Sequence, residues 1–290
     1  AFVDGDRIPV PPTHIVDRTP LPKHPYSNDN RPGMIAPGFD LEEVDMVFLE
    51  RSLKFLDNHA KQSPKKPFFL FHSMQAVHLP SFPADRFKGK TKAGPHGDFI
   101  FEMDFIVGEL IKSLKKHGMA DNTLVIFTSD NGPHNEAKHN PERFKPSGPL
   151  RGMKRTLTEG GIRVPTIAWW PNTVPKNTVS EDPFYFGDLM GTACEIAGAS
   201  KPEDLDSVSF LPTLKADSNK QLKHRYLYWE FYERTFRQAV IMKEWKLIRS
   251  DMDDSKIELY DLSKDIHEDK NIASEHPALA QRLISYMEEA

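Results

Sequence analysis

Three short apolar segments, separated by stretches of helical periodicity, constrain the fold of this chain more than any other feature. They are 67–74 (PFFLFHSM), 123–129 (TLVIFTS) and 164–170 (VPTIAWW). Their length, flanking residues and aromatic or β-branched content indicate buried strands. Amphipathic helices are predicted from 41 to about 60, from an Asp98 cap to Gly118, and near 187–197. Strands alternating with helices at these lengths predict an α/β domain whose mostly parallel sheet is flanked by helices.

The pattern changes after about residue 220, where strands follow one another without helices. Short strands are predicted at 226–232, 237–242, 245–249 and 257–261. Lys243–Glu244 is a connection short enough for a hairpin. Residues 276–290 form a predicted terminal helix. We therefore expect a larger α/β domain over 1–220 and a small antiparallel sheet with a helix over 221–290.

The first 40 residues are rich in proline and show no periodicity, so we predict an extended connection there. The chain starts at Ala1 without an initiator Met, and its opening reads as a surface connection that begins partway through a protein. We accordingly expect a further segment of the same protein upstream of Ala1. The sequence of this segment does not indicate the cellular compartment.

Composition and charge exclude several classes of protein. The formal net charge is -4 and the Lys and Arg residues are dispersed, so no nucleic-acid partner is expected. No apolar run approaches the roughly 18 residues of a membrane span, so none is predicted. Cys194 is the only cysteine, which excludes an internal disulfide. The composition predicts a globular protein.

Polar side chains follow the predicted strands where ligands bind in open parallel sheets. Asp130 and Asn131 come directly after 123–129 and could hold a hard cation such as Ca²⁺ or Mg²⁺. The alternative is a simple turn, because Asp, Asn and Gly also favour turns. His78, just beyond 67–74, could protonate a leaving group, or it could be a structural histidine.

The loop 150–165 (LRGMKRTLTEGGIRVP) combines several basic side chains with glycines. Arg151, Lys154, Arg155 and Arg163 in such a loop can approach an anion closely, and phosphate or sulfate would suit it. The alternative is a solvated basic loop in which the paired glycines only make a bend.

Taken in order, PFFLFHSMQAVHLP, DNTLVIFTSDNGPH, LRGMKRTLTEGGIRVPTIAWWP and the C-terminal YLYWEF, WKLIRS and IELYDLSKD resemble the successive signatures of the type I sulfatases. The resemblance implies an alkaline-phosphatase-like α/β domain and a small C-terminal antiparallel sheet. It implies Asp130 and Asn131 as ligands of Ca²⁺, with Mg²⁺ as the alternative. It implies Lys154 at the sulfate and bridging oxygen and His78 as the active-site histidine. His134 and Arg151 are the candidate substrate-binding residues.

Two parts of the family pattern are missing from this chain. It lacks the formylglycine segment in which the family makes its nucleophile, and Cys194 lies on a predicted buried helix without the Pro and Arg that a formylglycine cysteine requires. The consecutive Asp pair that completes the family's metal site is also missing, since Asp253–Asp254 falls between C-terminal strands. We therefore expect the nucleophile upstream of Ala1 and this chain alone to be inactive.

The resemblance predicts hydrolysis of an aryl or carbohydrate sulfate ester. It leaves open a phosphodiesterase or phosphonate monoester hydrolase of the same superfamily, and a non-catalytic homologue that binds sulfated glycans. The family also implies a periplasmic, secreted or lysosomal location.

Overall fold

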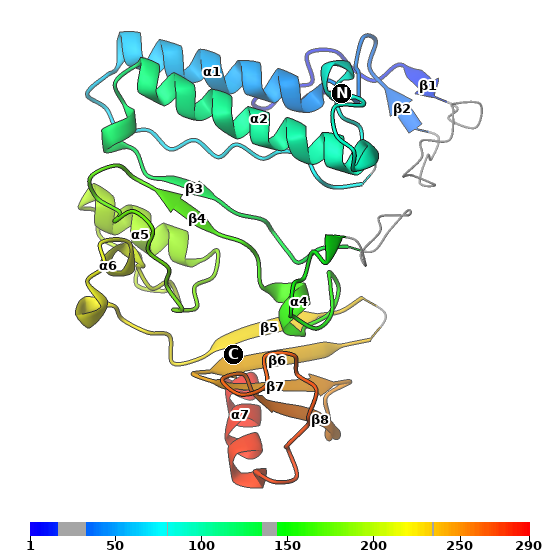
Figure 1. Ribbon diagram of the computed structural model, residues 1–290, viewed down its shortest axis with the longest axis vertical. Coiled ribbons are helices and arrows are strands. Elements are labelled where there is room, and N and C mark those ends of the chain that lie inside the picture. The colour runs from blue at the N-terminus through cyan, green and yellow to red at the C-terminus, as the bar shows by residue number, and fades with distance from the viewer. Residues whose placement is uncertain (17–32, 80, 135–143, 234) are drawn as a thin grey trace. The chain divides into compact units, whose positions relative to one another are not determined.

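A computed structural model describes residues 1–16, 33–79, 81–134, 144–233 and 235–290 (Figure 1). Within these residues the chain forms two compact units, one made of Ala1–Thr123 and the other of Leu124–His134 with Glu142–Ala290. The boundary predicted near 220 therefore falls inside the second unit. The physical reason is that the C-terminal sheet shares an apolar cluster with Leu157 and Ile162 of the preceding loop.

The first unit is mainly a pair of helices that lie side by side (Figure 1). Its elements are β1 (His14–Val16), β2 (Gly33–Ile35), α1 (Val44–Gln62), η1 (Asp85–Phe87), α2 (Gly94–Lys116) and η2 (Ala120–Asn122). β1 and β2 form an antiparallel ribbon inside the segment predicted as an extended connection. Leu49 and Leu56 of α1 and Phe99 and Ile106 of α2 are buried, as the apolar face of each helix predicts.

Helix α2 begins earlier than predicted, and Asp98 does not cap it. The helix starts at Gly94, which places Asp98 inside its second turn. The Asp98 carboxylate instead accepts hydrogen bonds from the backbone amides of Gly89 (2.8 Å) and Thr91 (2.7 Å). Asp98 thus holds the loop before the helix, while Gly118, with φ of +66°, follows its end as predicted.

The predicted strand 67–74 is wrong, because no strand is assigned in this fully described segment. Phe68 packs against α1, with its ring 5.9 Å from Phe55 and 5.0 Å from His59. Phe69 and Phe71, by contrast, are 76% and 69% exposed. The length, flanking prolines and apolar, aromatic composition of the segment predicted a buried strand. A strand also needs a neighbouring strand that pairs with its backbone, and no described strand pairs with this segment.

In the second unit, β3 (Val125–Phe127) and β4 (Ile167–Trp169) confirm two of the three predicted strands. They pair antiparallel, with Val125 opposite Trp169, and no described strand pair is parallel. The expectation of a mostly parallel sheet is therefore not met by the described pairs. Among the described residues of the connection between β3 and β4, the longest helix is the four-residue α4 (Glu159–Ile162), whereas a parallel crossover usually carries a longer helix.

Three further short elements follow β4, and then the C-terminal sheet predicted from the sequence. They are α5 (Asp188–Ala197), α6 (Leu211–Leu214) and η3 (Ser218–Lys220), then β5 (Leu227–Phe231), β6 (Arg237–Met242), β7 (Trp245–Ser250), β8 (Asp253–Asp261) and α7 (Pro277–Glu289). The four strands are antiparallel in the order β5-β6-β7-β8. The small antiparallel sheet, its β6–β7 hairpin and the terminal helix are confirmed.

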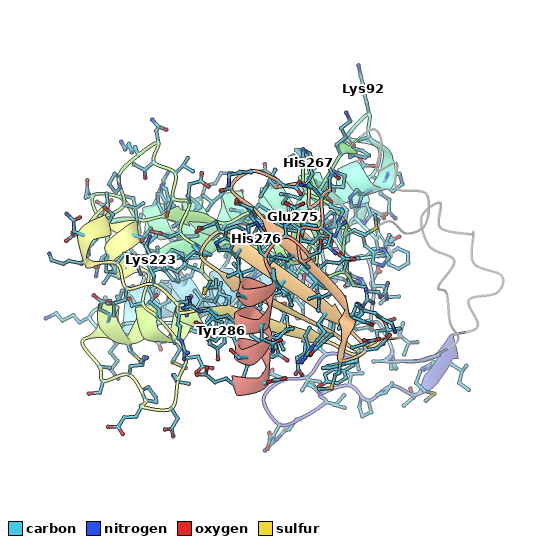
Figure 2. All side chains as sticks on the ribbon, turned by 90° about the horizontal axis from the view of Figure 1, so that it is seen from below. Lys92, Lys223, His267, Glu275, His276 and Tyr286 are labelled. Atoms are coloured by element: carbon cyan, nitrogen blue, oxygen red, sulfur yellow. The ribbon has the colours of Figure 1, made fainter. Side chains whose placement is uncertain are left out.

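The two faces of the C-terminal sheet have different partners (Figure 1). On one face, Leu247 packs with Leu283 and other residues of α7. Tyr286 of this helix, labelled in Figure 2, stacks on Tyr226 with ring centroids 4.8 Å apart. On the other face, Ile248 belongs to the cluster that includes residues 157 and 162 of the loop 150–165, called the glycine-rich loop below. The sheet therefore supports that loop directly.

None of the helices in the described ranges combines the length and the apolar character that crossing a membrane would need.

We expect Glu102→Gln to stabilise the protein above neutral pH. Glu102 is fully buried on α2. Its pKa is raised from 4.5 to about 7, mainly by burial and also by the charge of nearby Asp45, while a hydrogen bond from the Ala84 amide lowers it. Between pH 4.5 and pH about 7, Glu102 is protonated in the folded state and ionised in the unfolded state. The free energy of unfolding therefore falls as pH rises through this range. Gln keeps an acceptor for the Ala84 amide but has no charge to bury.

Denaturant unfolding over a pH series checks this expectation. At pH about 8 the Gln variant should be more stable than wild type by up to about 3 kcal/mol, since each pKa unit is worth about 1.4 kcal/mol, and the two should converge near pH about 4.5. Parallel stability curves across this range would contradict the role of Glu102.

Candidate active site

The turn after β3 and the glycine-rich loop are joined through their backbones. The Gly132 amide donates to the Gly161 carbonyl at 3.0 Å, and the Lys154 amide donates to the Pro133 carbonyl at 2.8 Å. These bonds bring the turn that carries Asp130 next to the loop that carries Lys154. Two of the sequence-predicted site segments are thus held together within one unit.

Glycine is required where these backbones meet. A Cβ atom at Gly132 would lie 1.9 Å from the Gly160 carbonyl oxygen, and a Cβ at Gly160 would lie 2.4 Å from the Gly152 carbonyl oxygen. Real Cβ atoms do not approach backbone oxygens so closely, so any larger residue would push the two segments apart. Gly152 also has φ of +84°, a conformation that glycine adopts without strain.

Asp130 and Asn131 lie at the carboxyl end of β3, as predicted. Asp130 is exposed and Asn131 is half-buried, and the Asn131 amide nitrogen donates to Asp130 Oδ1 at 2.8 Å. Carboxylate and amide oxygens suit a hard divalent cation, and Ca²⁺ takes roughly six to eight such ligands. Within the described ranges no three His, Cys, Asp or Glu side chains gather in a way that could hold a metal. These two residues therefore fit part of a cation site.

Arg151 is held by the C-terminal sheet. Its Nη2 donates to Glu258 Oε2 at 3.2 Å and to the Tyr260 hydroxyl at 3.1 Å, and the guanidinium lies 5.1 Å from the Tyr260 ring centroid. Burial raises the pKa of the Tyr260 phenol well above its usual range, and the hydrogen bond that the phenol donates to Glu258 raises it further. Tyr260 thus remains a neutral partner for Arg151.

Arg155 links His134 to the C-terminal part of the unit. Its Nη1 contacts His134 Nε2, and its Nε donates to Glu233 Oε2 at 2.8 Å. Lys154, which lies between Arg151 and Arg155 in the sequence, has a half-buried side chain. The sequence drew attention to the basic loop, but it gave no sign that Glu233 would lie beside it.

His78, the remaining predicted site residue, belongs to the first unit. Its Nδ1 lies 2.6 Å from the Leu79 carbonyl oxygen. The turn before it is fixed by Asp45, a buried carboxylate in the first turn of α1, which accepts hydrogen bonds from the amides of Gln75 (2.7 Å) and Ala76 (2.8 Å). Sequence reasoning missed Asp45, because an acidic residue early in a helix ordinarily only complements the helix dipole.

Two protein-family models match this chain. The sulfatase family model matches residues 12–199. The chain belongs to the sulfatase family. A second model, described as N-sulphoglucosamine sulphohydrolase, C-terminal, matches residues 153–289. The two matches together include the turn after β3, the glycine-rich loop and the C-terminal sheet.

Individual sulfatases resemble the chain over much of its length. An N-acetylgalactosamine-6-O-sulfatase of Bacteroides thetaiotaomicron is 31% identical over 268 residues, which is 85% of this chain and 51% of that protein. The human N-acetylgalactosamine-6-sulfatase is 36% identical over 173 residues, covering 59% of this chain and 32% of that protein. The chain thus spans about half the length of the Bacteroides relative, or less for the human one.

Solved structures give the same fold. One from a study of glycosaminoglycan metabolism by Bacteroides thetaiotaomicron superposes with a TM-score of 0.76 at 29% identity, covering 87% of this chain and 55% of that one. A sulfatase from Pseudoalteromonas superposes with a TM-score of 0.72 at 26% identity, covering 89% and 55%. The predicted fold class, an alkaline-phosphatase-like α/β domain with a C-terminal antiparallel sheet and helix, is confirmed as that of the sulfatases.

Proposed function

We propose that the full-length protein containing this chain hydrolyses carbohydrate sulfate esters. The observation that carries this proposal is the backbone junction of the two loops, which sets Lys154 beside the turn that bears Asp130 and Asn131 in a member of the sulfatase family. This arrangement combines a turn whose side-chain oxygens suit a cation with a basic loop suited to an anion such as sulfate.

We propose Ca²⁺, or alternatively Mg²⁺, as the divalent cation, with Asp130 and Asn131 as two of its ligands. The remaining ligands and a formylglycine nucleophile are proposed to come from a segment upstream of Ala1, because within the described residues no cluster of three His, Cys, Asp or Glu side chains could complete the cation site. Ser147–Arg151 (SGPLR) has the C/S-x-P-x-R spacing of the nucleophile motif, but its Ser147 hydroxyl donates to the Gly152 carbonyl at 3.0 Å and its Arg151 donates to Glu258 at 3.2 Å, so we assign it to the loop and not to the nucleophile. When bound, the cation would polarise the sulfate oxygens and neutralise charge on them.

The residues of this chain would act mainly on the leaving oxygen. Hydrolysis breaks the bond between sulfur and the ester oxygen, and negative charge develops on that oxygen. The Lys154 ammonium is proposed to stabilise this charge, and His78 to supply the proton that converts the leaving oxygen into a sugar hydroxyl. His134 and Arg151 are proposed to contact the substrate, with Glu258 and Tyr260 fixing the orientation of Arg151.

The names of the similar proteins suggest the first substrate to test. Two of them are N-acetylgalactosamine 6-sulfatases, so we propose a 6-sulfated N-acetylgalactosamine unit of a glycan. The family resemblance also supports a periplasmic, secreted or lysosomal location for the protein.

The experiment that tests this function compares the full-length protein with the isolated chain. The full-length protein should release sulfate from 6-sulfated N-acetylgalactosamine, lose this activity with a chelator and recover it with Ca²⁺. The isolated chain should release none. Faster cleavage of a phosphate diester would instead make the protein a phosphodiesterase. Binding of the sulfated sugar without turnover by the full-length protein would indicate a non-catalytic homologue.

A further inference from the structure

A buried ion cluster lies between the C-terminal sheet and the glycine-rich loop. Lys246 Nζ is 2.8 Å from Glu159 Oε1 and 2.9 Å from Glu268 Oε1. The three side chains are 0%, 3% and 0% exposed, respectively. Three charged groups have therefore been removed from water at one point in the fold, at a considerable desolvation cost.

The cluster is connected to the candidate active site through the backbone. The Glu159 amide donates to Glu268 Oε2 at 2.8 Å, which fixes the first residue of α4. The next residue, Gly160, donates to the Arg151 carbonyl at 2.7 Å, and the Gly161 carbonyl accepts the Gly132 amide at 3.0 Å. Lys154 lies on the segment between these anchored points. A shift of Glu159 would therefore move the backbone on both sides of the junction.

Stability alone does not account for a buried ion cluster here. The same face of the sheet already packs Ile248 and Tyr260 against Leu157 of the loop, and replacing buried ion pairs with apolar residues is often neutral or stabilising. Ionic and hydrogen-bonded contacts differ from apolar packing because they specify direction and distance. The cluster gives the start of α4 one defined position.

Other contacts from the same part of the unit hold the loop on both sides of Lys154. Glu258, on β8, holds Arg151 on one side. Glu233, which follows β5, holds Arg155 on the other. Charged partners thus hold the loop at Arg151 before Lys154, at Arg155 directly after it, and at Glu159 further along the chain.

We propose that Lys246 and Glu268 are positioning residues that set the glycine-rich loop, and with it Lys154, through Glu159. This inference rests on the proposed function for the role of Lys154. It assigns to the C-terminal sheet the task of orienting a catalytic side chain, in addition to its own packing against α7.

The test compares two methionine variants of the full-length protein. Lys246 and Arg249 are both buried cations of β7. Arg249 faces α7, since it contacts Gln238 at 2.8 Å and lies 3.9 Å from Glu288 of that helix. Both substitutions remove a buried charge from the same strand and should lower stability. Lys246→Met should also lower kcat about 10- to 100-fold with little change in KM, because a small displacement of a catalytic group has effects of this size. Arg249→Met should leave kcat near wild type.

Amide hydrogen exchange gives a readout that does not depend on catalysis. Peptides covering residues 151–161 should exchange faster in Lys246→Met and Glu268→Ala than in wild type or Arg249→Met. Glu268→Gln, which keeps an acceptor for the Glu159 amide, should restore much of the protection and of kcat. If Lys246→Met proves too unstable to purify, the two Glu268 variants make the same comparison.

The outcomes separate the two proposals. Folded Lys246→Met or Glu268→Ala with wild-type kcat and unchanged exchange over residues 151–161 would overturn the positioning role. Equal loss of kcat in Lys246→Met and Arg249→Met would also overturn it, because the loss would then follow stability. Faster exchange as expected, combined with normal kcat in Lys154→Ala, would support the positioning of the loop and refute the proposed function.

Discussion

Replacing Lys154 by alanine in the full-length protein should lower kcat by a factor of about 10² to 10³, the usual cost of losing one preorganised charge-stabilising group. The ammonium group is expected to interact more strongly with the departing oxygen in the transition state than with the intact ester, so kcat should change more than KM. Steady-state hydrolysis of the 6-sulfated sugar would measure both constants.

The stability of this variant should change by no more than about 0.5 kcal/mol, since the side chain is only half-buried and lies on a loop. Lys215→Ala is a matched control, because Lys215 is an exposed lysine of the same unit that directly follows α6. It should keep wild-type kcat. A Lys154→Ala enzyme with near-normal kcat, or one that simply unfolds, would mean that the glycine-rich loop is not the active-site loop.

Gly132→Ala should destabilise the protein by about 3 kcal/mol, at the upper end of the cost of overpacking. The new methyl group would lie 1.9 Å from the Gly160 carbonyl oxygen, and a backbone atom cannot move aside as the end of a flexible side chain can. Relief requires the turn after β3 and the glycine-rich loop to separate. The proposed sulfatase activity of the full-length protein should therefore be lost together with stability, as measured by denaturant unfolding and sulfate release.

The control for this substitution is Gly108→Ala on α2. A Cβ at Gly108 has no neighbour within 4 Å outside the backbone of its own helix. Because alanine is the better helix former, this variant should be more stable than wild type by about 0.5–1 kcal/mol. Equal stability changes in the two alanine variants would show that the close backbone junction at Gly132 does not exist as described.

Local patterns in the sequence were sufficient to predict the C-terminal sheet and helix. Its strands are consecutive and antiparallel, so a short connection such as Lys243–Glu244 specifies both neighbours and direction. The end of α5 was equally local, since Gly198 adopts φ of +65° directly after the helix. The positions of Asp130 and Asn131 at the end of β3 also followed from the strand pattern.

Features that depend on distant partners could not be predicted. The direction of β4 relative to β3 is set by the path of the intervening chain, which the apolar pattern does not reveal. The segment 67–74 has the composition of a buried strand but no partner among the described residues. Glu268 reaches Glu159 across more than a hundred residues of sequence, and nothing in its neighbourhood distinguishes it from a surface acid. The role of Glu268 therefore became apparent only from the structure.

The two faces of β7 give the β6–β7 turn an unusual sensitivity to length. In the present register Lys246 lies opposite Ile241, facing the loop, while Leu247 faces α7. Side chains alternate along a strand, so a one-residue slip would bring Leu247 against the carboxylates and Lys246 into the apolar contact with the helix. Exposed hairpin turns usually tolerate insertions. Here an insertion between Lys243 and Glu244 that shifts the register would lower stability by disrupting the contacts on both faces of the sheet.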